Sequence, residues 1–227
     1  KVFEMGASSK QAIIFDFDGT LVDASEAICH SFNQALEKGQ LPRMDPREIR
    51  AMIGTPLVGM FKSVVKDLPG VDVDQFVRDY RSAFFTHSLV LTRLMPGTEE
   101  TLTHFSSHAK LGIATSRKSD GVLHILGNFG LLGLFSAVVG IEHVSAPKPD
   151  PEPIHRTLEQ LQVPSDRAVM VGDTVGDMIA SKRAGLTAVG VTTGTSNRAD
   201  LIKGGADHVV TELSALVDLI ELSNLAT

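Results

Sequence analysis

The chain has 227 residues, of which 43% are hydrophobic and 21% are charged, as in a folded globular protein and unlike a disordered chain. Its 21 Lys and Arg residues and 27 Asp and Glu residues give a net charge of −6 without any block of basic residues, so we expect no nucleic-acid partner. Its apolar runs are shorter than the ~20 residues that cross a bilayer, so we expect no membrane partner.

The sequence also bears on the location of the protein. The N-terminal stretch carries Glu4 and Lys10 and lacks the apolar core of a secretory signal. Cys29 is the only cysteine, so no intramolecular disulfide can form, and we expect it to be a small buried side chain. We therefore expect a cytoplasmic protein that is a monomer or a homodimer.

The first predicted strand covers residues 12–15 and runs directly into Asp16 and Asp18, followed by Gly19 and Thr20. Residues two apart in an extended strand point the same way, so the two carboxylates share one face. Two like charges this close are costly unless a proton or a cation lies between them. Taken alone, the segment could also be an acidic turn, since Asp, Gly and Thr are common in turns.

The segment from residue 21 to residue 94 is predicted to be helical throughout. It is far longer than the roughly 10 to 12 residues of a minimal crossover between parallel strands. We therefore predict an all-helical cap domain at residues 21–94, inserted into a core formed by residues 1–20 and 95–227. Phe76, Tyr80 and Phe84 recur at helical spacing, and such aromatic residues usually form a core.

Further strands are predicted at residues 111–115, 137–140, 168–171 and 187–191, separated by helical segments. This alternation indicates an α/β fold with a Rossmann-like parallel sheet. Polar residues follow three of these strands, namely Thr115 with Ser116, Lys148, and Asp173 with Asp177. Because parallel strands end at the same sheet edge, we expect these side chains to converge on Asp16 and Asp18. Alone, Asp173 and Asp177 could simply be the acidic start of a helix.

The segment at residues 190–194 contains two glycines but lacks the Lys-Ser or Lys-Thr ending of a phosphate-binding loop. We expect it to lead into a helix capped by Ser196.

The polar residues form a recognisable set of motifs: Asp16-Phe17-Asp18-Gly19-Thr20-Leu21-Val22-Asp23, Thr115, Lys148-Pro149, and Gly172-Asp173 with Asp177. In order and spacing they resemble the four motifs of the haloacid dehalogenase superfamily. The resemblance covers about residues 10 to 210. The helical insertion after the first motif is similar to the cap of the phosphoglycolate phosphatase and β-phosphoglucomutase branch.

The resemblance implies a role for each core residue. Asp16 matches the nucleophile that becomes an aspartyl-phosphate, and Asp18 matches the general acid and base. Thr115 matches the hydroxyl that binds a phosphoryl oxygen, while Lys148 would bridge Asp16 and the phosphoryl group. Members that cleave carbon–halogen bonds typically lack the second acid, so Asp18 favours phosphate esters.

A magnesium site is implied by the same resemblance. Its ligands would be Asp16, the main-chain carbonyl of Asp18, and Asp173, with waters completing an octahedron. Asp177 would hold one of these waters or orient Lys148.

Substrate contacts are expected from two places. Gly19, Thr20, Ser116 and Arg117 would contribute from the core, and Gly54 with Thr55 from a cap loop. The phosphatase branch often has Asn and then Lys after the motif threonine, whereas Ser116, Arg117 and Lys118 follow here. This departure leaves the contacts of the core loop open.

We therefore predict a Mg²⁺-dependent phosphatase for a small phosphorylated metabolite such as 2-phosphoglycolate. A sugar phosphomutase is the main alternative, although the loop at residues 54–57 with Phe61 resembles the phosphatase branch and lacks the arginine of the mutase branch. A phosphonate hydrolase would need a cap lysine, for which Lys38, Lys62 and Lys66 are available. A phospho-accepting receiver module fits poorly, because its acceptor lies on a later strand and it has no long insertion.

Overall fold

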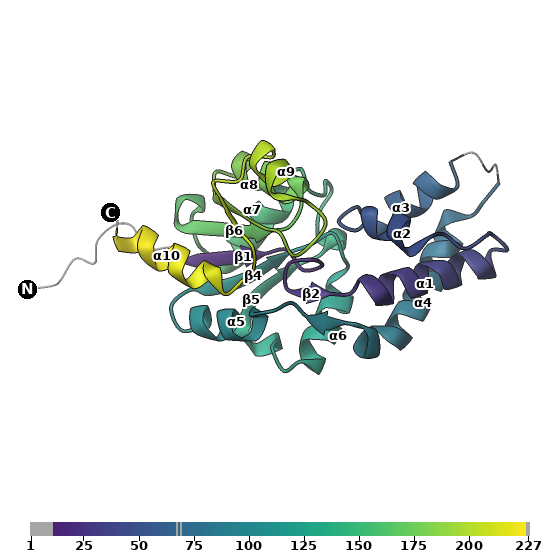
Figure 1. Ribbon diagram of the computed structural model, residues 1–227, viewed down its shortest axis with the longest axis horizontal. Helices are drawn as coiled ribbons and strands as arrows, with labels where there is room; N and C mark the ends of the chain where they lie inside the picture. The colour runs from purple at the N-terminus through teal and green to yellow at the C-terminus, as the bar shows by residue number, and fades with distance from the viewer. Residues whose placement is uncertain (1–10, 67, 69, 226–227) are drawn as a thin grey trace, which may run out of the picture.

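The structure is a computed structural model that describes residues 11–66, 68 and 70–225. Residues 1–10 and 226–227 of the predicted core lie outside the described residues. Figure 1 shows a core built on a sheet, with a group of helices beside it. Among the helices of the described ranges, none combines the length and the apolar character that crossing a bilayer requires.

The core is a six-stranded sheet in the order β5-β4-β1-β6-β7-β8, and all neighbouring strands are parallel. Its strands are β1 (Ala12–Phe15), β4 (Lys110–Ala114), β5 (Phe135–Val139), β6 (Ala168–Gly172), β7 (Thr187–Val191) and β8 (His208–Val210). The five predicted strands are present with their ends shifted by two residues at most, which confirms the α/β fold. The edge strand β8 was not predicted.

Helices cover both faces of the sheet because the strand side chains alternate in direction. Ile13 and Phe15 of β1 belong to a cluster that includes residues of α5 (Thr98–Ser106), α6 (Ser119–Asn128) and α10 (Ala215–Leu225). Ala12 and Ile14 belong to a second cluster, with residues of α7 (Glu152–Leu161) and α8 (Val175–Arg183). The sheet is therefore a buried middle layer, as Figure 1 shows.

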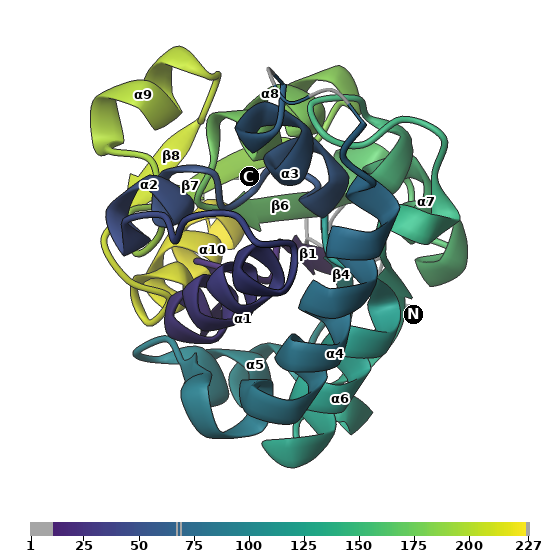
Figure 2. The same cartoon turned by 90° about the vertical axis from the view of Figure 1, so that its right-hand side faces the viewer.

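The inserted segment contains α1 (Ser25–Lys38), α2 (Pro46–Ala51), α3 (Leu57–Val64) and α4 (Val73–Leu91), which face the viewer in Figure 2. Its interior is an aromatic stack. The rings of Phe32 and Phe61 lie 4.2 Å apart and those of Phe61 and Phe76 lie 5.4 Å apart. Cys29 is buried nearby, and burial raises the pKa of its thiol. The predicted domain boundaries at residues 20/21 and 94/95 stay a prediction.

The expectation that residues 21–94 are helical throughout is wrong at both ends of the segment. Two short strands, β2 (Val22–Asp23) and β3 (Arg93–Leu94), pair antiparallel where the chain leaves and re-enters the core. Two passes of the chain that run side by side satisfy their backbone groups by pairing with each other. This ribbon connects the four helices to the sheet.

Candidate active site

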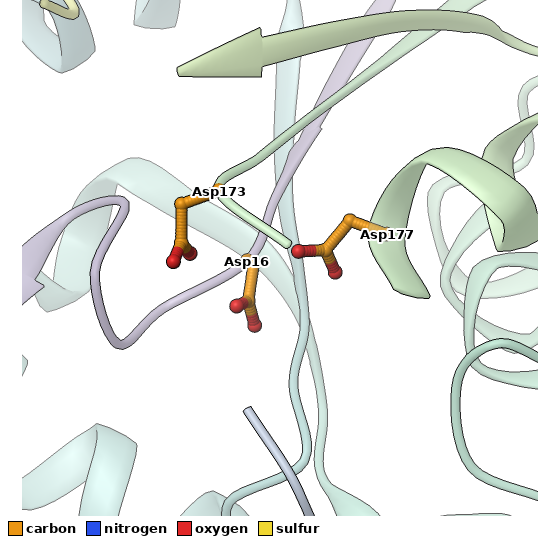
Figure 3. Close-up of side chains that lie close together, drawn as sticks. All are labelled: Asp16, Asp173 and Asp177. Atoms are coloured by element: carbon orange, nitrogen blue, oxygen red, sulfur yellow. The ribbon is translucent and has the colours of Figure 1, made fainter. Parts of the chain in front are cut away.

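Three buried carboxylates meet at the carboxyl edge of the sheet, as Figure 3 shows. Asp16 directly follows β1, Asp173 follows β6, and Asp177 lies in the first turn of α8. One carboxylate oxygen from each lies within 4.8 Å of the others. The structure therefore brings together three of the acids that the sequence predicted to converge.

The carboxylate of Asp173 is held by residues from two loops. Its Oδ1 accepts a hydrogen bond from the Thr20 hydroxyl at 3.0 Å, and its Oδ2 accepts one from the Thr195 amide at 3.0 Å. Gly19 has φ +85°, and a Cβ at this position would lie 2.5 Å from Asp173 Oδ2. Only glycine leaves room for the carboxylate in this left-handed conformation.

Gly19 and Thr20 were expected to contact substrate, which stays a prediction, and the structure places both beside Asp173. Thr20 is fully buried, and neither residue lines the pocket described below. Thr20 donates a hydrogen bond to Asp173, and Gly19 leaves room for its carboxylate. The short polar turn after β1 must first accommodate the neighbouring carboxylate, which the spacing of the motif does not reveal.

The ammonium group of Lys148 lies between two of the acids. Its Nζ is 2.8 Å from Asp16 Oδ1 and 2.5 Å from Asp177 Oδ1, and it donates to the Ala114 carbonyl at 2.9 Å. These contacts use all three of its donors. The other oxygen of Asp177 accepts from the amide and the hydroxyl of Thr174, at 3.0 and 2.6 Å. Asp177 is thus placed to orient Lys148, one of the two roles expected for it.

Burial dominates the electrostatics of the three carboxylates. It raises the pKa of Asp16 to about 8, and Asp177 and Asp173 push in the same direction while Lys148 opposes them. Burial likewise raises the pKa of Asp173 to about 7, with a further contribution from Asp177. Burial would lower the pKa of Lys148, but Asp16 and Asp177 hold it above its ordinary value. Three carboxylates face one ammonium, so this buried edge would carry surplus negative charge once all three are ionised.

The residues fit a divalent cation. The donor set consists of oxygens, which suits Mg²⁺, and a cation would offset the surplus charge. Asp16, Asp173 and Asp177 could each offer one oxygen to it, and Asp16 and Asp173 are the two that the sequence predicted as carboxylate ligands. The main-chain carbonyl of Asp18 was also expected to bind the metal ion, and this contact stays a prediction.

The carboxylate of Asp18 pairs with Arg117. The guanidinium donates from Nε to Oδ2 at 2.8 Å and from Nη2 to Oδ1 at 2.6 Å. Its Cζ also lies 4.2 Å from the centre of the Phe84 ring on α4. Burial would lower the pKa of Arg117, but Asp18 holds it above its ordinary value. Arg117 was expected to contact substrate, and it does line the pocket described below, while its fork is directed at Asp18.

A pocket of about 250 Å³ lies in front of Asp16 and Asp18. Thr115 and Ser116 contribute to it from the core, and Gly54 and Thr55 contribute from the cap loop, as expected from the sequence. Further walls come from α1, α3, α4 and α6. The pocket therefore brings the cap loop and the two acids of the first motif to one cavity.

Several residues of this site were missed by the sequence reasoning. Tyr80 and Phe84 were expected to be core residues only, and they are buried, but they also line the pocket together with Phe85 and His124. The Thr195 amide donates a hydrogen bond to Asp173, although its loop was expected only to lead into a helix. The helix after it, α9 (Arg198–Lys203), is capped by Asn197 and not by Ser196.

The amino-acid sequence contains only weak indications that these residues belong to the site. An aromatic ring at helical spacing can be core and pocket wall at once, and a backbone amide donor leaves no mark in the sequence.

Comparison with known proteins agrees with this architecture. A model for "Haloacid dehalogenase-like hydrolase" matches residues 13–191. The chain is 35% identical over 208 residues to "Probable phosphatase IndB" of Dickeya dadantii, covering 89% of this chain and 90% of that protein. It is 30% identical over 217 residues to "Pyrophosphatase PpaX" of Bacillus pumilus, covering 95% and 99%.

A solved structure gives the same picture. The crystal structure of a predicted phosphoglycolate phosphatase from Haemophilus somnus has a TM-score of 0.83 and 25% identity, covering 94% of this chain and 99% of that chain. The family match spans β1 through β7 and includes all three acids of the buried edge. The protein therefore belongs to the haloacid dehalogenase-like hydrolase family and is an enzyme of the phosphatase kind found among its relatives.

Proposed function

We propose that the protein hydrolyses a phosphate monoester through an aspartyl-phosphate on Asp16, in a Mg²⁺-dependent reaction. The observation that carries the proposal is the position of Asp16. Its carboxylate lines the pocket beside Asp18 while Lys148 and two further buried acids surround it. A carboxylate held this way can attack phosphorus without being free to turn away.

The first step would transfer the phosphoryl group. A carboxylate oxygen of Asp16 forms a bond to phosphorus, the bond from phosphorus to the ester oxygen breaks, and Asp18 gives its proton to the leaving alkoxide. Asp18 needs a proton in this step, and the hydrogen bonds from Arg117 hold its carboxyl group in place.

The second step would return the enzyme to its starting state. Asp18, now ionised, takes a proton from a water molecule, whose oxygen attacks phosphorus and releases orthophosphate and the Asp16 carboxylate. Thr115 and Ser116 line the same pocket and can donate hydrogen bonds to phosphoryl oxygens. Mg²⁺ held by Asp16 and Asp173 would offset the charge of the phosphoryl group and the nucleophile.

The substrate expectation of 2-phosphoglycolate rested on the cap loop and on two cations after Thr115. The loop does approach the core, since a Cβ on Gly54 would lie 3.0 Å from Thr174 Cγ2. Arg117, however, is paired with Asp18. Of these two cations, only Lys118 has no ion pair among the described residues. We keep a small phosphorylated metabolite as the proposed substrate, without nucleic-acid or membrane partners, for a cytoplasmic monomer or homodimer.

The alternative activities differ in what they need from the cap. None of Lys38, Lys62 and Lys66 is among the described pocket residues, and Lys38 pairs with Asp79. A phosphonate hydrolase therefore has no support from these lysines. A mutase would pass the phosphoryl group of Asp16 to a second hydroxyl instead of water, and an assay separates the two.

The test is orthophosphate release from a panel of phosphate monoesters with Mg²⁺. We expect release that stops in excess EDTA, and we expect the isosteric Asp16→Asn variant to lose at least about 10³-fold in rate while keeping its unfolding temperature. Rapid interconversion of β-glucose 1-phosphate and glucose 6-phosphate with negligible orthophosphate would instead identify a mutase. Near wild-type turnover by Asp16→Asn would remove Asp16 as the nucleophile.

A further inference from the structure

The part of the pocket beyond Asp16 and Asp18 is largely apolar. The side chains that form it from the cap include those of Ile28, Ile53, Leu57, Met60 and Phe84. The volume of about 250 Å³ is small for a ligand pocket, since such pockets usually measure roughly 300 to 1,000 Å³. The site is therefore shaped for a compact leaving group with apolar surface.

One wall of the pocket is a pair of stacked rings that joins the cap to the core. Phe85 of α4 and His124 of α6 have ring centroids 4.2 Å apart and planes inclined by 20°. Phe85 is 65% exposed, which is unusual for a phenylalanine that lines a cavity. A ring of the substrate packed here would cover this aromatic surface and gain the stacking that such rings favour.

Two buried polar atoms of the pocket have no hydrogen-bond partner within the described part of the chain. They are Ser116 Oγ and His124 Nε2. Leaving a buried polar atom unpaired is costly, so a partner from outside the chain is expected. Ser116 follows Thr115 and can meet the phosphoryl group, whereas His124 lies with Phe85 on the wall that faces the leaving group.

The cations nearest the reacting acids are already engaged. Arg117 pairs with Asp18, and Lys148 pairs with Asp16 and Asp177. Arg81 and Lys118 also line the pocket, but Arg81 is exposed on α4. Away from Lys118, a carboxylate on the leaving group would be placed among apolar side chains, which is costly without a paired cation.

We infer that the leaving-group side of this pocket binds a compact ring-bearing alcohol, packed against Phe85 and His124. The preferred substrates are then phosphate monoesters of such alcohols, ahead of small acids such as 2-phosphoglycolate. This inference rests on the proposed phosphatase function and replaces the substrate expected from the sequence.

The test compares three esters of primary alcohols, which differ mainly in what fills the pocket. They are benzyl phosphate, ethyl phosphate and 2-phosphoglycolate, each assayed for orthophosphate release with Mg²⁺. Burying a ring against this wall should raise kcat/KM for benzyl phosphate by about tenfold or more over each of the other two.

Variants of the wall test whether the preference arises there. Phe85→Ala and His124→Ala should each lower the benzyl-to-ethyl ratio of kcat/KM by about fivefold. His124→Phe keeps a flat ring at the position and should retain most of the ratio. Val90→Ala is the matched control, because Val90 is on the same helix, is 80% exposed and does not line the pocket. It should leave the ratio unchanged.

The outcomes separate the inference from the function on which it rests. Equal kcat/KM for the three esters, a preference for 2-phosphoglycolate, or a ratio unaffected by Phe85→Ala would overturn the inference and leave the phosphatase standing. Absence of orthophosphate from every ester would overturn the proposed function. In that case calorimetric binding of benzylphosphonate and ethylphosphonate still tests the pocket, and equal affinities would overturn the inference.

Discussion

Arg117 connects Asp18 to the cap through a single side chain. Its fork bonds to both oxygens of Asp18, and its guanidinium lies over Phe84. Both partners of the ion pair are largely shielded, with side chains 11% and 15% exposed. A bidentate pair in such surroundings fixes the orientation of Asp18 as well as its charge.

We predict that Arg117→Gln lowers the free energy of unfolding by about 1 to 3 kcal/mol, because Asp18 is left without its partner. It should also lower kcat by about tenfold or more, since Asp18 is no longer held at the reacting atoms. Arg117→Lys restores the charge but not the fork, so it should recover only part of either loss. Urea unfolding and steady-state kinetics measure both, and wild-type values for Arg117→Gln would show that the pair has no such role.

For individual residues, the sequence predicted which side chains lie close together but not the direction in which each one points. The convergence of Asp16, Asp173 and Asp177 follows from their places after parallel strands. The direction of Arg117 does not, because its partner Asp18 is 99 positions away in the chain. The sequence did not indicate His124 for a similar reason. Its ring nitrogen without a described hydrogen-bond partner is recognised only in the structure, where α4 covers α6.

Among the elements, the loop before α3 brings the cap into contact with the core. Gly54 has φ +100°, and a Cβ there would lie 3.0 Å from Thr174 Cγ2. Thr174 in turn bonds with Asp177. The loop thus rests on the segment that carries two of the buried acids.

We predict that Gly54→Ala lowers kcat/KM by about tenfold, because the added methyl group pushes the loop away from Thr174 and strains a left-handed residue. Gly70→Ala is the matched control. Gly70 has φ +81°, but a Cβ there would meet nothing within 4 Å. Both variants should lose a similar amount of stability in urea unfolding. Equal losses of kcat/KM in both would mean that backbone strain alone, and not the contact with Thr174, explains the effect.

The elements themselves were predicted where their pattern was strong. β1 and β7 have the predicted bounds, because each is a short apolar run between turn residues. β8 was missed, because it is a three-residue edge strand that begins with an exposed histidine. β2 and β3 were missed because two residues carry no periodicity, and only their pairing across the inserted segment defines them.

For the whole molecule, the buried acids link stability to pH and to metal. The pKa of Asp16 is raised to about 8 and that of Asp173 to about 7, from 3.8. Between about pH 4 and about pH 8 the folded state therefore holds protons that the unfolded state has released. The contribution of these groups to stability is present below their unfolded pKa values and is lost as the pH rises through the folded ones.

We predict that the unfolding temperature in EDTA falls between about pH 5 and about pH 8, and that Mg²⁺ raises it more at the higher pH. The cation replaces the protons that the carboxylates give up. Asp173→Asn removes one of the charges and should weaken both trends. Thermal unfolding monitored by fluorescence measures them. A Mg²⁺ effect that is absent, or larger at about pH 5, would contradict the metal site.

The phosphoryl group is expected on Asp16, and trapping it there is a direct experiment. The Asp18→Asn variant is mixed with p-nitrophenyl phosphate and Mg²⁺, quenched in acid and digested for mass spectrometry. A good leaving group needs little protonation, whereas activation of the water is lost, so the phosphoryl group should accumulate. We predict that the peptide containing Asp16 gains the mass of one phosphoryl group, on Asp16 itself. Continued release of orthophosphate with Asp16 unmodified, or the phosphoryl group on another residue, would contradict the account.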